Sequence, residues 1–245
     1  MKKLRSLIIL ALCSGLLLTS CTDSNKEKEI EDKLEEAYGG DFTFIRKMPV
    51  NYFPFIPSYY QYFYNWDQLD GKHFESVYVT TKGDGFQTNA NYAYYYDDIY
   101  SFFTAEIGKA FPGQILSSHV MEHFGGFETE IEKISYDEAL HDQEYNLDCI
   151  IGVDDVSDHE TVERILDETF KGYKMRVQAE IVSKEDAELA RTKADSSLTG
   201  SLEIFQDYKK HLPDHEYYLY ISDTETMKGA TGWYDKKASA KASKS

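Results

Sequence analysis

Five consecutive residues, His119-Val120-Met121-Glu122-His123, have the residue types and spacing of a zinc site. On a helix, two histidines four residues apart project from one face and can bind the same zinc ion through their imidazole nitrogens. A glutamate beside them can act as the general base for a zinc-bound water. If residues 119–123 are helical, the pattern predicts a hydrolase with His119 and His123 as metal ligands and Glu122 as the base.

The H-x-x-E-H pattern resembles the zinc-binding motif of the inverzincin peptidases, and Phe124-Gly125-Gly126 resembles the apolar and glycine residues that follow it. The resemblance implies a third ligand, a glutamate roughly seventy to eighty residues further on. Residues 194–200 contain no glutamate, although Glu203 lies near the edge of that window. Ser117-Ser118 stands where the family has glycines. The alternative is an exposed helix end that carries two histidines and no metal, and the sequence predicts no cofactor.

The second candidate for a functional site is the segment 51–66, in which nine of sixteen residues are aromatic. Exposed tyrosine and tryptophan rings can stack on sugar rings or clamp a peptide. The candidate ligand-binding aromatics are Tyr59, Tyr60, Tyr62 and Trp66. The alternative is an irregular lid, because Pro54 and Pro57 prevent a regular central strand in the first half. Its aromatic residues would then cover one side of a sheet.

The first twenty-one residues indicate where the protein is located. A basic start is followed by the apolar run 7–18 and by Leu18-Thr19-Ser20-Cys21, as in a secretory signal segment. This ending resembles the lipobox of bacterial lipoproteins, which implies that Cys21 is diacylated and becomes the N-terminus after cleavage. The apolar run is too short for a membrane-spanning helix, which needs about 20 residues, so the lipid on Cys21 is the predicted membrane anchor. The alternative is an ordinary signal peptide and a soluble secreted product.

The composition argues against nucleic acid as a partner and against a disulfide within the folded chain. Removal of residues 1–20 removes three basic residues and no acidic ones, so the formal charge goes from −17 to −20. This negative charge argues against binding to nucleic acid. Cys13 lies in the leader and Cys21 is the lipid site, which leaves Cys149 without a disulfide partner. The apolar segment 147–153 around Cys149 predicts a buried strand.

The elements that must position these residues are visible in the periodicity of the chain. Apolar residues at helical spacing predict helices over 30–38, 99–111, 157–170, 183–194 and 198–212. Alternation predicts strands over 42–48, 74–80, 86–96, 127–131, 173–181 and 216–221, with a hairpin turn at Gly83-Asp84-Gly85. Asp97 and Asp98 are expected to cap one helix, and Ser157 with Glu160 is expected to form a capping box. The sequence therefore predicts an α+β fold, with helices packed on one face of a mainly antiparallel sheet.

The predicted organisation is a signal peptide at 1–20, an acidic tether at 21–29 and one α+β domain at 30–235. The alternative for that range is two α/β halves that meet near 135–145. A disordered Lys/Ala/Ser tail is predicted at 236–245. The layout resembles uncharacterised surface lipoproteins of Gram-positive bacteria, a resemblance that implies no particular activity. We expect a non-enzymatic protein on the extracytoplasmic face of the cell membrane that binds a wall glycan or a surface protein. The alternative function is a membrane-tethered zinc hydrolase that uses His119, Glu122 and His123.

Overall fold

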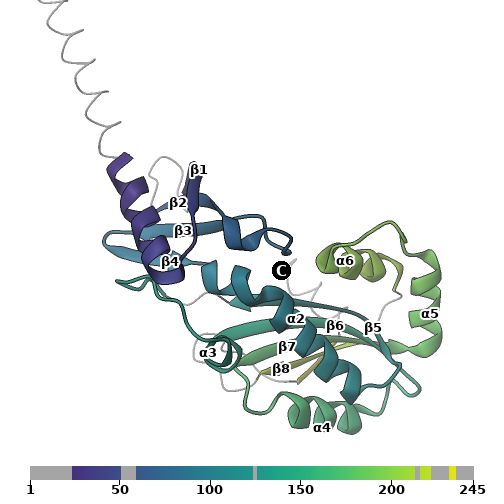
Figure 1. Ribbon diagram of the computed structural model, residues 1–245. Helices are drawn as coiled ribbons and strands as arrows, with labels where there is room; N and C mark the ends of the chain where they lie inside the picture. Colours follow the sequence, from purple (N-terminus) through teal and green to yellow (C-terminus); the bar gives the residue numbers. More distant parts are fainter. Residues whose placement is uncertain (1–23, 51–58, 124–125, 213–215, 222–231, 236–245) are drawn as a thin grey trace, which may run out of the picture. The chain divides into compact units, whose positions relative to one another are not determined.

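The computed structural model describes residues 24–50, 59–123, 126–212, 216–221 and 232–235 (Figure 1). The predicted signal peptide, Cys21 and the predicted tail at 236–245 lie outside these residues. Residues 24–29, expected to belong to the tether, form the first turns of a helix that spans 24–38. No helix in the described ranges is long and apolar enough to cross a membrane.

The described residues group into two compact units. Unit 1 extends to Tyr94 and includes Gly126–Ile134, and unit 2 contains Tyr95–Gly125 and the chain from Ser135 onward. The boundaries at 94/95, 125/126 and 134/135 fall within the range 30–235, which is predicted to form one domain or two halves that meet near 135–145. Each unit has its own sheet.

Unit 1 combines the helix at 24–38 with a four-stranded antiparallel sheet. The strands are β1 (Phe42–Val50), β2 (Tyr59–Trp66), β3 (Val77–Lys82) and β4 (Gly85–Thr88), and they are paired in sequence order. A short 3-10 turn, η1 (Asp67–Leu69), follows β2. The turn between β3 and β4 confirms the predicted hairpin, because Lys82 pairs with Gly85.

The helix at 24–38 covers one face of this sheet. Ile30 and Leu34 are fully buried in a cluster with Tyr64 of β2 and Val79 of β3. The helix ends as predicted at Gly39-Gly40. Gly40 has a φ of +83°, and a Cβ there would lie 2.9 Å from Trp66 Nε1, so no other residue fits this exit from the helix.

Unit 2 contains a five-stranded sheet with the order β5-β6-β7-β8-β9. The strands are β5 (Ile115–His123), β6 (Glu144–Val153), β7 (Met175–Ser183), β8 (Glu216–Ile221) and β9 (Gly232–Asp235). The helices are α2 (Ala90–Ala110), which begins in unit 1, α3 (Tyr136–Asp142), α4 (His159–Phe170), α5 (Lys184–Lys193) and α6 (Ser201–His211). Strands β6 and β7 are parallel and are connected through α4, whereas all other neighbours are antiparallel.

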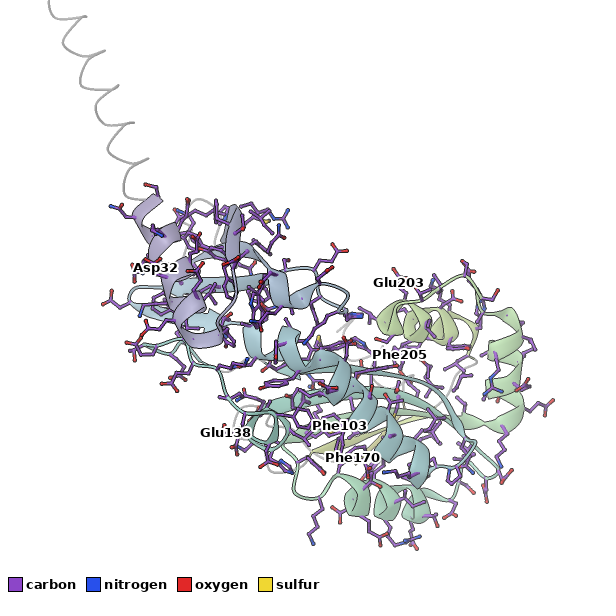
Figure 2. The ribbon with its side chains drawn as sticks, in the orientation of Figure 1. Asp32, Phe103, Glu138, Phe170, Glu203 and Phe205 are labelled. Atoms are coloured by element: carbon purple, nitrogen blue, oxygen red, sulfur yellow. The ribbon has the colours of Figure 1, made fainter. Side chains whose placement is uncertain are left out.

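Helices pack on both faces of the unit 2 sheet. On one face, Phe103 of α2 contacts Phe170 of α4 at 6.3 Å and Tyr145 of β6 at 5.5 Å between ring centroids; Figure 2 labels Phe103 and Phe170. On the other face, Ile150 of β6 forms a smaller buried cluster with α5 and with Phe205 of α6. The second apolar layer explains why β6 is buried on both faces over its last five residues.

The predicted α+β class and the mainly antiparallel pairing are confirmed, whereas several local boundaries were wrong. Helix α2 begins at Ala90, so Asp97 and Asp98 are exposed positions within the helix rather than caps. The N-cap of α4 is Asp158, because its side chain accepts the Thr161 N–H. Residues 127–131, expected to form a strand, make one isolated bridge between Phe86 and Glu128.

Candidate functional site

The H-x-x-E-H residues lie on strand β5, so the expected helix at 119–123 is wrong. A strand advances about 3.3 Å per residue, which separates the backbone positions of His119 and His123 by roughly 13 Å. Glu122 pairs with Tyr145 and His119 pairs with Asp148 on β6, and this alternation places Glu122 and His119 on opposite faces of the sheet. The geometry that would let two histidines share one zinc ion is therefore absent from these residues.

His119 instead takes part in a hydrogen-bonded connection between three elements of unit 2. Its Nδ1 lies 3.1 Å from Ser201 Oγ at the start of α6. The same hydroxyl lies 3.2 Å from the Tyr96 hydroxyl of α2, a side chain that is 3% exposed. The contacts join β5, α2 and α6 through polar groups, which gives His119 a structural role.

Glu122 is a buried carboxylic acid. The side chain is 7% exposed, and its Oε2 has no hydrogen-bond partner among the described residues. Burial raises the pKa of Glu122 from 4.5 to about 8, because the charged form loses its hydration. The folded protein therefore favours a protonated Glu122 at neutral pH.

Two of the four candidate aromatics, Tyr62 and Trp66, belong to the core of unit 1. Each is 3% exposed, and the predicted exposed platform is wrong for both. Trp66 stacks on Phe42 at 5.0 Å, and its Nε1–H donates to the Gly39 carbonyl at 3.1 Å. Tyr62 and Trp66 are covered because they belong to the buried cluster that includes Ile30 and Leu34 of the helix at 24–38.

Tyr60 is 36% exposed. Its side chain lies on the face of β2 opposite that of Tyr59, the fourth candidate. The ammonium group of Lys47 lies 3.9 Å from the centroid of the Tyr60 ring. The segment 51–58, with Pro54 and Pro57, lies outside the described residues. The expectation of an irregular lid is wrong for residues 59–66, which form the regular strand β2.

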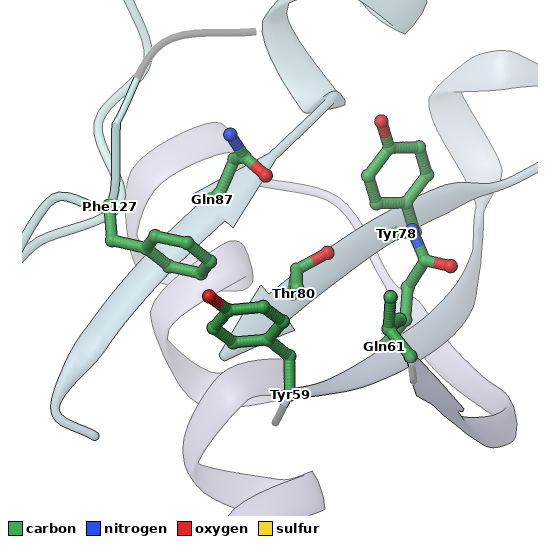
Figure 3. Close-up of a pocket in the computed structure, with 7 residues that line it drawn as sticks. Tyr59, Gln61, Tyr78, Thr80, Gln87 and Phe127 are labelled. Carbon is green, nitrogen blue, oxygen red and sulfur yellow. The ribbon is translucent and has the colours of Figure 1, made fainter. Parts of the chain in front are cut away.

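Tyr59 lines a pocket of about 470 Å³ on the face of the unit 1 sheet opposite the helix at 24–38 (Figure 3). The lining residues are Val50, Tyr59, Gln61, Tyr78, Thr80, Gln87 and Phe127. The rings of Tyr59 and Phe127 stack at 5.5 Å with an interplanar angle of 24°. Figure 3 shows Thr80 between this aromatic pair and Tyr78.

A row of polar side chains crosses three strands inside this pocket. Gln61 of β2 pairs with Thr80 of β3, and Thr80 pairs with Gln87 of β4. Residues opposite each other in a sheet have their Cβ atoms about 5 Å apart. The row therefore brings amide, hydroxyl and amide groups together at regular spacing, and a glutamine amide is a group that can both donate and accept hydrogen bonds.

Phe127 reaches the pocket because residues 126–134 return to unit 1. Two backbone hydrogen bonds between Phe86 and Glu128, at 2.7 and 2.8 Å, hold this segment against the edge of β4. Gly85 leaves room for the aromatic side chain, since a Cβ at Gly85 would lie 2.9 Å from the Phe127 Cβ. A residue distant in sequence thus completes the aromatic wall.

The described lining residues combine aromatic rings with neutral hydrogen-bonding groups. Among these seven residues, the amide and hydroxyl groups of Gln61, Thr80 and Gln87 lie beside the rings of Tyr59, Tyr78 and Phe127. Aromatic faces beside neutral hydrogen-bonding groups suit a ligand that has both apolar ring faces and hydroxyl groups. Of the lining residues, Tyr59 is the one predicted from the sequence as a ligand-binding candidate, because the others come together through strand register.

Cys149 is fully buried in β6, as the sequence predicted. Burial raises the pKa of its thiol, with smaller contributions from Asp148 and Glu180. Because a thiolate is the reactive form, the thiol is inert in the folded protein. Within the described ranges, no group of three or more His, Cys, Asp or Glu side chains is arranged to hold a metal ion.

No family model matches this chain, and no curated protein matches it. Among solved structures, the chain is similar to a DUF5037 family protein from Ruminococcus gnavus, at 13% identity and a TM-score of 0.34. The similarity covers 89% of this chain and 98% of that chain. A TM-score this low establishes no shared fold.

Proposed function

We propose that this protein is a lipid-anchored glycan-binding protein on the extracytoplasmic face of the cell membrane. The observation that supports binding is the pocket on unit 1, in which the Gln61-Thr80-Gln87 row lies between aromatic side chains. The ring of a sugar has apolar C–H faces that pack on aromatic rings, and its hydroxyls both donate and accept hydrogen bonds. The pocket offers both kinds of contact.

The anchor is supported by the leader sequence. Cys21 follows the basic start, the apolar run and Leu18-Thr19-Ser20. Two acyl chains provide stable membrane attachment, because each buried methylene contributes about 0.8 kcal/mol. Replacement of Cys21 by alanine should remove the acyl mass and release the protein from the membrane fraction. A Cys21→Ala protein that stays with the membranes would disprove the lipid anchor.

Glycan binding is tested with the full-length protein in detergent micelles on an array of neutral and acidic oligosaccharides. Tyr59→Ala and Phe127→Ala each remove one ring of the stacked pair, and the resulting loss of about 1 kcal/mol predicts roughly five- to tenfold weaker binding. Tyr60→Ala is the matched control, because Tyr60 is adjacent in sequence and lies on the other face of β2. Its binding should equal that of the wild type.

The binding of the three variants shows whether the pocket is a glycan site. Binding that both pocket variants weaken and Tyr60→Ala preserves supports the proposal. If no oligosaccharide binds at millimolar concentration, or if all three variants bind as the wild type does, the pocket is not a glycan site. Circular dichroism of each variant distinguishes loss of binding from loss of fold.

A further inference from the structure

The strands that form the pocket carry positive charge and no negative charge. Strands β1, β2, β3 and β4 contain no aspartate or glutamate, although the whole chain has 43 acidic and 26 basic residues. The registers place Arg46 and Lys82 on the face that contains the pocket. Asp84 and Glu128 are close in sequence to lining residues, but neither lines the pocket. The pocket face is therefore a local cationic surface on an acidic protein.

The two cations lie at opposite ends of the pocket. Lys82 Nζ lies 5.2 Å from the ring centroid of Tyr59 and 5.8 Å from that of Phe127. Arg46 Cζ lies 4.6 Å from the ring centroid of Phe63, which in turn contacts Tyr78 at 6.2 Å. Lys82 therefore lies against the aromatic pair of the pocket, whereas Arg46 lies against Phe63, a neighbour of the lining residue Tyr78.

Within the described ranges, neither cation forms an ion pair. Aromatic rings attract cations through their electron-rich faces, which holds the Lys82 ammonium and the Arg46 guanidinium near the pocket. Such a contact leaves hydrogen-bond donors of both groups available to a ligand. Arginine and lysine bind carboxylates through short, charge-assisted hydrogen bonds.

We propose that the ligand is an acidic glycan, a chain of sugar residues that carry carboxylate groups. A sugar ring packs against Tyr59 and Phe127, its hydroxyls bond to the Gln61-Thr80-Gln87 row, and its carboxylate binds Lys82. Arg46 binds the carboxylate of a further residue of the chain. The inference rests on the proposed glycan-binding function and assigns its ligand class. The net negative charge, −17 for the whole sequence and −20 after removal of residues 1–20, repels a polyanion at long range, so these local contacts must supply the selectivity.

The test compares matched acidic and neutral oligosaccharides by isothermal titration of the full-length protein in detergent. The pairs are trigalacturonate with galactotriose, trimannuronate with mannotriose, and sialyllactose with lactose. At least one acidic member should bind about tenfold more tightly than its neutral partner, which corresponds to about 1.4 kcal/mol. Lys82→Gln should reduce that ratio to less than about threefold. Lys47→Gln, on the opposite face of the sheet, should leave the ratio unchanged.

Each outcome decides between the two proposals. If neutral members bind as tightly as acidic ones in every pair, the acidic ligand class is wrong and the glycan-binding function stands. If Lys82→Gln prefers an acidic oligosaccharide over its neutral partner as strongly as the wild type does, the selectivity does not come from this pocket face and the inference is overturned. If no member of any pair binds, both proposals are wrong.

Discussion

The buried carboxyl group of Glu122 makes the stability of unit 2 depend on pH in a direction opposite to that of most carboxylates. The pKa of Glu122 is raised from 4.5 to about 8 by burial, and its Oε2 has no hydrogen-bond partner in the described structure. Between these two pKa values the folded protein binds one more proton than the unfolded chain. Its free energy of unfolding therefore falls as the pH rises and stops falling above about pH 8.

The size of the effect follows from the pKa shift. One unit of pKa corresponds to about 1.4 kcal/mol, so ionisation of Glu122 lowers the free energy of unfolding by several kcal/mol between pH 4.5 and 8. Glu122→Gln is neutral at every pH and lacks this dependence. From pH 5 to pH 8, the wild type should lose at least about 2 kcal/mol of unfolding free energy relative to Glu122→Gln.

The assay is urea denaturation followed by far-UV circular dichroism at pH 5, 6.5 and 8. The urea concentration at which the buried Cys149 becomes reactive toward a thiol reagent at pH 8 identifies the transition of unit 2. Glu185→Gln, an exposed position on α5, is the control and should follow the wild type at each pH. A difference between wild type and Glu122→Gln that stays within about 0.5 kcal/mol from pH 5 to 8 would refute a buried, uncharged Glu122.

Three further predictions concern the core, a helix cap and the free thiol. Trp66→Ala should lower the free energy of unfolding by about 3–5 kcal/mol, because it leaves a cavity and removes the hydrogen bond to Gly39. Thermal denaturation measures this loss, and Tyr60→Ala should lower the free energy of unfolding far less. Ser135→Ala should lower the free energy of unfolding in urea by about 1 kcal/mol, because Ser135 forms a capping box at the start of α3; an unchanged urea midpoint would contradict the cap. Cys149 should react with a thiol reagent at pH 8 in urea and stay unmodified in the native protein, and fast native labelling would show that β6 opens.

Where local residues decide the structure, the sequence predicted it well. The bounds predicted for strand β7 and helix α5 are close to the observed ones, because alternation and an N-cap at Ser183 are properties of neighbouring residues. The strand at 119–123 was missed for a local reason as well. Glu122 occupies a buried position in β5, so a charged residue stands where alternation would show an apolar one, and the two histidines suggested helical spacing instead.

The pocket could not be predicted, because no short stretch of the sequence contains it. Gln61, Thr80 and Gln87 become neighbours through the registers of β2, β3 and β4, and a shift of one residue in either register would break the row. Phe127 joins them from a segment about forty residues further along, through its bridge to β4. The same alternation shows why Tyr59 faces the pocket while Tyr62 and Trp66 are buried on the other face.

The most direct test of glycan binding in the pocket is an NMR titration that follows the side-chain amide signals of the glutamines. With the oligosaccharide that binds most tightly on the array, the signals of Gln61 and Gln87 should shift together in a saturable way. The signal of Gln178, which donates to Asp148 in unit 2, should stay in place. Shifts confined to glutamines outside the pocket, with Gln61 and Gln87 unchanged at saturation, would contradict a glycan site on this sheet.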